Sequence, residues 1–139
     1  MIVLDTSGLL AAMFDDQRAH DECRAALEAA EPPLLLSPFV LAELDYLVGR
    51  NAGVAVELSM LEEVAAGAYT LAEFGAADVD RSRQLIDQYR DFGIGLADAS
   101  LVVLADRVGT HDLLTLDERH FRAMTAIDGD VFRLLPADG

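Results

Sequence analysis

The chain begins with a short apolar run that ends in a carboxylate. Residues 1–4 are all apolar and lead directly into Asp5, which is followed by the hydroxyl residues Thr6 and Ser7. An apolar run this short, with β-branched members, predicts a strand buried on both faces in the middle of a parallel sheet. Ligands of open α/β sheets bind just beyond the carboxyl ends of the strands, which makes Asp5 a candidate site residue. Taken alone, Asp5 is equally well interpreted as a helix cap.

The rest of the chain alternates short strands with helices. We expect further strands at 34–36, 68–71, 112–115 and 131–135, and the last of these should lie at an edge of the sheet. We expect helices at 8–14, 17–30, 37–50, 54–66, 76–92 and 97–108, with a short one just after Asp117. Ser7 is the expected cap of the first helix. This alternation predicts an α/β fold, a three-layer α/β/α arrangement around a mostly parallel sheet of four or five strands. The length of 139 residues fits a single domain, which we place at residues 1–135, with a short disordered tail at 136–139.

Charge and cysteine content narrow the classes of partner and compartment. The formal net charge is −15, and all ten basic residues are arginine. This charge argues against a broad basic face for nucleic acids and favours a basic partner, or a site where metal cations reverse the local sign. Cys23 is the only cysteine, no secretory signal is visible and no apolar run approaches the ~18 residues of a membrane span, so we expect a cytoplasmic protein without a membrane segment.

Glu43 is the clearest candidate for a carboxylate outside the solvated surface. Its neighbours one turn before are Phe39 and Val40, and those one turn after are Tyr46 and Leu47. Because all four are apolar or aromatic, we expect Glu43 to point along the packed face of its helix. A buried carboxylate needs a hydrogen-bond donor, an arginine or a metal ion, since otherwise it is protonated or strongly destabilising.

Two aspartates later in the chain lie in similar surroundings. Asp98 follows Ile94 by one turn and precedes Leu101 and Val102 by one turn, in the first turn of the most apolar helix. Asp117 follows the fourth expected strand, as Asp5 follows the first. Each of the two could instead be a helix N-cap.

The four carboxylates make most sense together. Asp5 and Asp117 lie beyond two strand ends, while Glu43 and Asp98 lie on helices, so all four can converge on one cleft if the two strands are neighbours. Clustered carboxylates raise one another's pKa unless cations lie between them, and oxygen ligands alone favour Mg²⁺ or Mn²⁺. A zinc site is not expected, because the three histidines are scattered and the cysteine has no ligand partner.

Four segments resemble the acidic motifs of the PIN-domain ribonucleases, and the whole chain is similar to the VapC-type toxins of type II toxin–antitoxin modules. The segments are Asp5-Thr6-Ser7, Ala42-Glu43-Leu44, Leu96-Ala97-Asp98-Ala99 and Thr115-Leu116-Asp117 with Phe121. The resemblance implies a PIN-like fold and a Mg²⁺-dependent endoribonuclease, with Mn²⁺ able to substitute, that cleaves a structured tRNA or rRNA to leave a 5′-phosphate and a 3′-hydroxyl.

The resemblance also implies roles for individual residues. Asp5 and Asp98 would be the principal metal ligands, Asp117 would support the same or a second ion, and Glu43 would ligate an ion or orient water on it. Thr6 and Thr115 could hydrogen-bond a carboxylate or a phosphate. The implied partners are a second copy of the chain, forming a homodimer, and a VapB-type antitoxin that wraps a hydrophobic groove and inserts a basic side chain into the acidic site.

An RNA substrate fits the acidic charge less well, because it is itself a polyanion. Our hypothesis is that metal ions and local arginines bind its phosphates, with Arg119 and Arg122 nearest to Asp117 in the sequence. The alternative is that both are ordinary surface arginines.

Other classes with an aspartate after the first strand fit less well. Haloacid-dehalogenase phosphatases need a second aspartate where this chain has Ser7, and they need a lysine, as do receiver domains and P-loop hydrolases. The remaining alternative is a catalytically silent PIN-like module that binds RNA or protein.

Overall fold

The computed structural model of the protein describes residues 1–139, with a five-stranded, entirely parallel sheet flanked by seven α-helices. The strands are β1 (Ile2–Leu4), β2 (Leu34–Leu36), β3 (Thr70–Leu71), β4 (Asp112–Leu114) and β5 (Arg133–Leu135), in the order β3-β2-β1-β4-β5. The helices are α1 (Thr6–Met13), α2 (His20–Ala29), α3 (Pro38–Ala52), α4 (Val54–Ala65), α5 (Ala76–Gln88), α6 (Leu96–Val108) and α7 (Glu118–Ala123), with a 3₁₀ turn η1 (Arg90–Phe92). The predicted α/β/α fold is confirmed.

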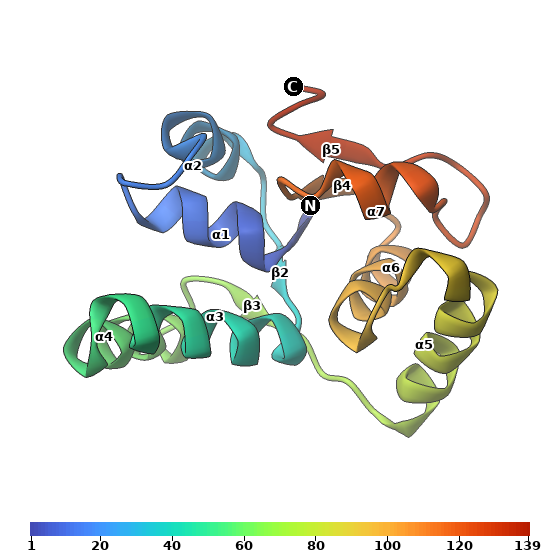
Figure 1. Cartoon of the computed structure of the whole chain (residues 1–139), viewed down its shortest axis with the longest axis horizontal. Coiled ribbons are helices and arrows are strands. Elements are labelled where there is room, and N and C mark those ends of the chain that lie inside the picture. The colour runs from blue at the N-terminus through green and yellow to red at the C-terminus, as the bar shows by residue number, and fades with distance from the viewer.

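The apolar run at the N-terminus forms the central strand, as its composition predicts. β1 pairs with β2 on one side and with β4 on the other, and its residues are at most 1% exposed. Figure 1 shows α1 to α4 on one side of the strands and α5 to α7 on the other. The strand order explains this division. The chain moves toward one edge of the sheet from β1 to β3, and then returns across the sheet to β4 and moves on to the opposite edge at β5. Right-handed crossovers place the connecting helices on opposite faces for these two directions.

The start of α1 differs from the sequence prediction. The helix begins at Thr6, and Asp5 rather than Ser7 is its N-cap, accepting a hydrogen bond from the backbone N–H of Thr6. Ser7 was therefore wrongly predicted as the cap of this helix, and the alternative interpretation of Asp5 as a helix cap is confirmed. The structure shows that Asp5 caps the helix and also faces other carboxylates. Two other helices are shorter than predicted: α2 begins only after Ala19, which has a left-handed backbone (φ 61°), and the predicted 76–92 helix breaks into α5 and η1.

The C-terminal tail is folded back onto the domain, so its expected disorder was wrong. The backbone N–H of Leu134 donates to the carboxylate of Asp138 at 2.8 Å, and the Asp138 N–H donates to the carbonyl of Leu134 at 2.7 Å. The guanidinium of Arg122 on α7 donates to both oxygens of the same carboxylate. Asp138 therefore stabilises a turn with Leu134 and forms an ion pair with Arg122. Neither contact can be read from the local sequence.

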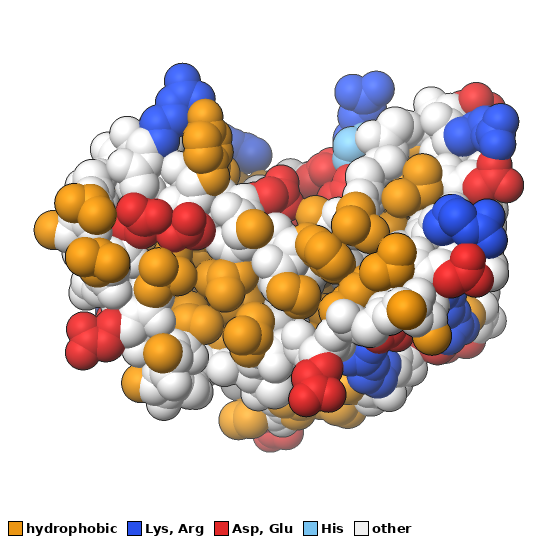
Figure 2. Space-filling model, turned by 90° about the horizontal axis from the view of Figure 1, so that it is seen from below, with side chains coloured by type: hydrophobic (Ala, Val, Ile, Leu, Met, Phe, Trp, Pro, Cys, Tyr) orange, Lys and Arg blue, Asp and Glu red, His pale blue; other side chains and the backbone are white.

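The surface carries two contrasting features, both visible in Figure 2. Acidic side chains gather in a hollow at one edge, with a histidine and basic side chains on its walls. Apolar side chains spread over the face below it. The exposed large apolar residues of the chain include Tyr46, Val54, Val56, Leu58, Leu71, Val79, Phe92 and Leu96. None of the helices has the length and apolar character needed to cross a membrane.

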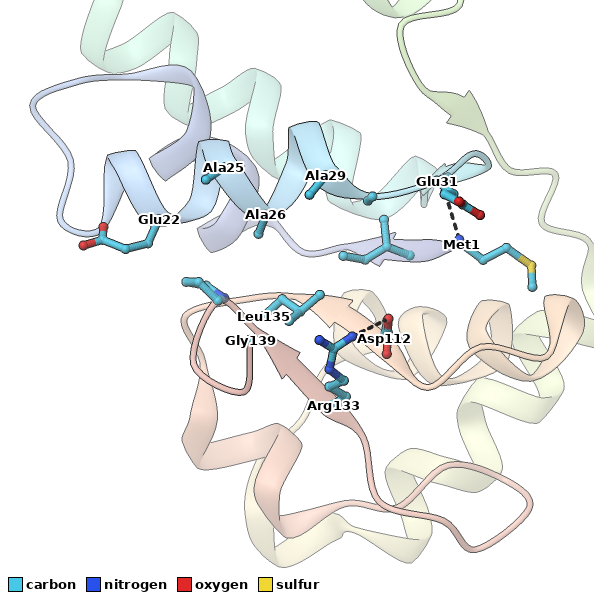
Figure 3. Close-up of a pocket in the computed structure, with 13 residues that line it drawn as sticks. Met1, Glu22, Ala25, Ala26, Ala29, Glu31, Asp112, Arg133, Leu135 and Gly139 are labelled. Carbon is cyan, nitrogen blue, oxygen red and sulfur yellow. Dashed lines mark hydrogen bonds and ion pairs between the residues drawn. The ribbon is translucent and has the colours of Figure 1, made fainter.

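A second hollow, of about 580 Å³, is lined by residues of α2, β4, β5 and both ends of the chain (Figure 3). It is bounded by the alanine-rich face of α2 on one side and by β5 and the tail on the other, and an ion pair between Arg133 and Asp112 spans part of its wall at 3.2 Å. The first residues of β1, β4 and β5 line it, together with the last residue of β5 and part of the tail. None of the four candidate carboxylates takes part in it.

Candidate metal-binding active site

The carboxyl ends of β1 and β4 bring Asp5 and Asp117 to the same edge of the sheet. Leu4 is paired with Leu114, and the N–H of Asp5 donates to the carbonyl of Leu114 at 2.9 Å. Asp117 follows β4 by three residues and caps α7, accepting a hydrogen bond from the His120 N–H at 3.1 Å. The capping role and the position at the strand end are therefore compatible for Asp117, as they are for Asp5.

Asp5 is a buried carboxylate whose oxygens are mostly satisfied by the protein. It is 7% exposed. Its Oδ2 accepts hydrogen bonds from the hydroxyls of Thr115 at 2.7 Å and Ser7 at 3.0 Å, and its Oδ1 accepts one from the Thr6 N–H at 2.9 Å. Burial raises the pKa of Asp5 above its ordinary value, while these hydrogen bonds oppose the rise and the charge of Asp117 adds to it. A carboxylate accepts about four hydrogen bonds, so Oδ1 retains a lone pair for a further partner.

Two hydroxyl side chains join the strand ends. Thr115, which is 1% exposed, donates to Asp5 and accepts from the N–H of Asp117 at 2.9 Å. Ser7 also donates to Asp5 and accepts from the N–H of Leu116 at 3.0 Å. These bonds fix the position of Asp5 relative to the loop that carries Asp117.

Asp98 faces this edge from the start of α6. The N-cap of α6 is Gly95, so the alternative interpretation of Asp98 as a cap is wrong. Its pKa is raised to about 6, first by burial and then by the charge of Asp5, with smaller contributions from Asp117 and Glu43, and the charge of His120 opposes the rise. The carboxylate is therefore electrostatically crowded, a condition that a bound cation would relieve.

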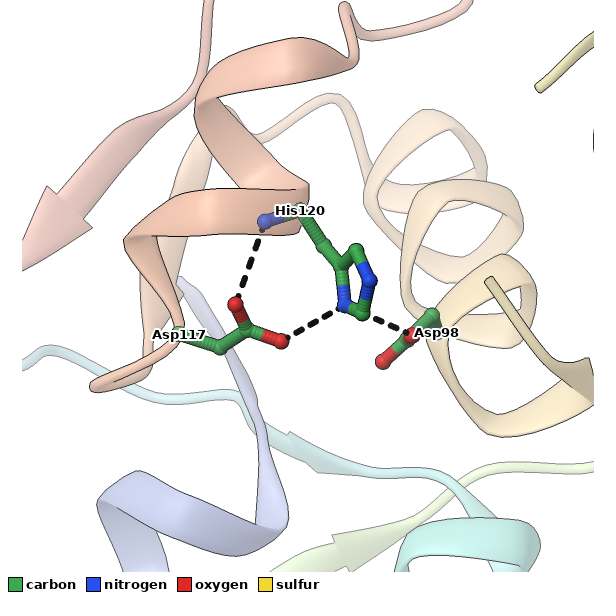
Figure 4. A group of neighbouring side chains, drawn as sticks. All are labelled: Asp98, Asp117 and His120. Carbon is green, nitrogen blue, oxygen red and sulfur yellow. Dashed lines mark hydrogen bonds and ion pairs between the residues drawn. The ribbon is translucent and has the colours of Figure 1, made fainter. Parts of the chain in front are cut away.

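His120 lies between two of the aspartates, as Figure 4 shows. Its Nδ1 is 2.9 Å from Oδ2 of Asp117 and 3.5 Å from Oδ2 of Asp98. The side chain is 23% exposed, so the imidazole is part of the wall of the site. His120 was not predicted as a site residue, although it follows Asp117 by three residues at the start of a helix, a spacing that places two side chains on one face.

Glu43 reaches the site from a more exposed position than expected. The side chain is exposed, and the expectation that it is packed inside was wrong. The apolar neighbours that suggested burial do not all face the core, since Tyr46 is 61% exposed, and the buried stripe of α3 runs instead through Val40, Leu44 and Val48. Glu43 is held near Asp5 by the hydroxyl of Thr6, which donates to Oε1 at 3.4 Å. Partial desolvation, followed by the charge of Asp5, raises the pKa of Glu43.

The two arginines near Asp117 have different surroundings. Arg122 forms ion pairs with Glu118 and Asp138, both at 2.8 Å, and these hold its guanidinium against the tail. Arg119 is exposed and forms no ion pair. Only Arg119 is therefore free to meet a phosphate without breaking an existing contact.

The donor set fits a divalent cation. One ligand atom each from Asp98, Asp117 and His120 lie within 4.8 Å of one another, and Asp5 and Glu43 add negative charge beside them. Burial is the first cause of the raised pKa values of Asp5, Asp98 and Glu43, and the charges of neighbouring carboxylates add to it, so that a bound cation would favour the charged form of all three. The arrangement can hold a metal ion and place it next to a solvent-accessible surface.

Comparisons with known proteins bear on the family and the fold. The profile of the PIN domain matches residues 2–126. Ribonuclease VapC26 of Mycobacterium tuberculosis is 45% identical over 139 residues, covering 97% of this chain and 100% of that protein. Among solved structures, M. tuberculosis VapC20, described as a sarcin-ricin loop cleaving toxin, has a TM-score of 0.79 at 15% identity, covering 91% of this chain and 98% of its own. A toxin–antitoxin complex from Klebsiella pneumoniae has a TM-score of 0.67 at 21% identity, covering 94% and 96%.

Proposed function

The chain belongs to the PIN-domain family, and we propose that it is the VapC-type toxin of a type II toxin–antitoxin module, acting as a metal-dependent endoribonuclease. The observation that carries the proposal is the convergence of Asp5, Asp98 and Asp117, with Glu43 beside them, on the carboxyl edge of the sheet. Strong support comes from the ribonuclease that is 45% identical over nearly the whole length of both proteins.

We propose that Asp98, Asp117 and Asp5 hold Mg²⁺, for which Mn²⁺ can substitute. A divalent ion bound there supplies an activated water and neutralises negative charge on the phosphate. Thr115 and Ser7 orient the Asp5 carboxylate through the hydrogen bonds described above, and Thr6 orients Glu43. Glu43 lies on the exposed side of the group, where it can accept a hydrogen bond from the attacking water or a leaving hydroxyl.

The direct test is cleavage of structured RNA, both tRNA and rRNA, by the purified protein with Mg²⁺ or Mn²⁺, with EDTA, and with the Asp5→Asn variant. We expect cleavage that needs the ion and that falls on the order of 100-fold or more in the variant, because a ligand charge is lost while the shape of the side chain is kept. Cleavage that survives both EDTA and the substitution would refute the mechanism. Absence of cleavage on every RNA would favour a silent binding module.

We propose Arg119 as a phosphate contact, with Arg122 as its matched comparison. Charge reversal of Arg119 should weaken RNA binding and leave the folded structure unchanged, because Arg119 has no protein partner. Reversal of Arg122 should mainly destabilise the tail, since its guanidinium is held by Asp138 and Glu118. Equal RNA affinities for Arg119→Glu and the wild type, measured at fixed salt, would contradict this role.

The proposed partners are a VapB-type antitoxin and a second copy of the chain. A complex of both components is known for the Klebsiella relative, which has the same fold. The net charge of −15 suits a basic partner, and the exposed apolar side chains of α3, α4 and α5 offer area for burial (Figure 2). Light scattering should give twice the chain mass of 15.0 kDa for the isolated protein, and a monomeric mass at micromolar concentration would contradict the homodimer.

A further inference from the structure

We propose that His120 is a direct ligand of the bound ion through Nδ1, so that the site prefers first-row transition ions such as Mn²⁺ over Mg²⁺. The inference rests on the proposed metal site and adds a nitrogen ligand to carboxylates that alone would favour Mg²⁺. It follows from where the ring lies rather than from the acidic motifs, none of which includes this histidine.

The geometry matches adjacent positions around one ion. Two ligands at about 2.1 Å from an octahedral ion are about 3 Å apart when they occupy neighbouring positions. Nδ1 of His120 is 2.9 Å from the Asp117 oxygen and 3.5 Å from the Asp98 oxygen. Figure 4 shows Nδ1 turned toward the space between the two carboxylates, with the rest of the ring directed away from it.

The backbone holds the ring at this place. His120 lies in the first turn of α7, and Asp117 caps that turn through the His120 N–H at 3.1 Å. The same aspartate therefore fixes the helix start and faces the ring nitrogen. A neutral imidazole carries its proton on either nitrogen, so Nδ1 becomes a ligand when the proton is on Nε2.

A nitrogen donor changes which ion binds best. Mg²⁺ requires hard oxygen ligands and gives up its waters reluctantly. Sites that mix imidazole and carboxylate bind first-row transition ions more tightly than Mg²⁺, and their affinity rises from Mn²⁺ to Cu²⁺. Asp98, Asp117 and His120 are such a mixed set. A purely electrostatic histidine makes the opposite prediction: an imidazolium placed between two carboxylates competes with a metal ion, and its removal strengthens binding.

The test is pulsed electron paramagnetic resonance of Mn²⁺ bound to the wild type, to His120→Asn and to His111→Asn. His111 is the matched control because its Nε2 lies 2.7 Å from Asp128 and it belongs to the second group of possible ligands, with Asp130. We expect nitrogen coupling in the wild type, its loss in His120→Asn and its retention in His111→Asn. Labelling the wild type with ¹⁵N-histidine should change the coupling, which identifies an imidazole without relying on a variant.

Competition with Mg²⁺ provides the second readout. We expect Mn²⁺ affinity to fall on the order of 10-fold in His120→Asn, with a smaller fall for Mg²⁺. Mn²⁺ bound without imidazole coupling, or more tightly in the variant, would overturn the inference and leave the proposed function intact, provided that Asp5→Asn still abolishes Mn²⁺ binding. Failure of Mn²⁺ to bind the wild type at all would overturn the proposed metal site itself.

Discussion

The site depends on individual hydroxyl groups as well as on carboxylates. Burial raises the pKa of Asp5, and the hydrogen bonds that Thr115, Ser7 and the Thr6 N–H donate to its carboxylate oppose that rise. Buried polar networks of this kind lower the cost of desolvation and set the direction of each lone pair. Removal of one donor should therefore affect metal binding as well as stability.

Thr115→Val tests this role, with Thr110→Val as its control. Both threonines are buried, and each accepts a hydrogen bond from the N–H two residues later, at 2.9 Å in Thr115 and 3.2 Å in Thr110. Only Thr115 also donates to Asp5. Both variants should lose about 1–3 kcal/mol of unfolding free energy in denaturant titrations.

The two variants should separate in metal binding. Thr115→Val should lower Mn²⁺ affinity by about 10–100-fold in calorimetry, because a residue that orients a ligand is lost, whereas Thr110→Val should leave it unchanged. Equal affinities in both variants would show that Thr115 supports the fold alone.

At the scale of elements, the site requires α1 to pack closely on β4. A Cβ atom added at Gly8 would lie 2.6 Å from the backbone carbonyl oxygen of Leu114. The helix would have to move, and Ser7 would then lose its bond to Leu116. Gly8→Ala should cost about 2 kcal/mol or more of unfolding free energy and also reduce metal affinity.

Gly75→Ala is the matched control for Gly8→Ala, because nothing lies within 4 Å of the Cβ position at Gly75 and its φ of −104° suits any residue. Its unfolding free energy should fall by about 1 kcal/mol or less, because Gly75 is the N-cap of α5 and alanine is a poorer N-cap than glycine. A Gly8→Ala variant as stable as this control would contradict the close packing.

The contact between α7 and the tail should give the protein a defined acid sensitivity. The hydrogen bonds from Arg122 hold the pKa of Asp138 down to about 2, below its ordinary value of 3.8. A lowered pKa in the folded state means that the contribution to stability is present above pH 3.8 and is lost as the pH falls toward 2. The stability difference between the wild type and Asp138→Asn should therefore shrink over this interval.

The measurement is thermal unfolding at a series of pH values, with Asp91→Asn as a control that changes the charge equally. Asp91 takes part in no ion pair or side-chain hydrogen bond of the structure, so its difference from the wild type should show no comparable decline. A difference for Asp138→Asn that stays constant down to pH 2 would refute the ion pair.

For the molecule as a whole, the order of the strands and helices along the chain was easier to predict from the sequence than the contacts between them. Apolar runs located all five strands, and the run at residues 2–4 was recognised as central because apolar side chains on both faces need a sheet neighbour on each side. The four carboxylates were chosen for local reasons, at strand ends or on helices. Their convergence depended on the pairing of β1 with β4, which sequence alone left conditional.

The residues whose roles were not predicted all depend on contacts that cannot be read from the neighbouring sequence. His120, Ser7 and Asp138 matter through partners that the fold supplies from elsewhere, or through a helix turn whose start was unknown. Glu43 was assigned to the interior because its neighbours are apolar, but an apolar neighbour such as Tyr46 can itself be on the surface. In the sequence, an apolar residue that lies on the surface cannot be distinguished from one that lies in the core.

One edge of this acidic molecule is proposed to bind a divalent ion through Asp5 after β1, Asp98 on α6, Asp117 after β4 and His120 on α7. Anomalous diffraction from crystals soaked in Mn²⁺ tests it most directly. We predict a peak about 2.0–2.5 Å from oxygens of Asp98 and Asp117 and from Nδ1 of His120, which disappears in Asp98→Asn. A wild-type crystal with no peak at this edge, or with a peak only beside His111, would show that the ion does not bind there.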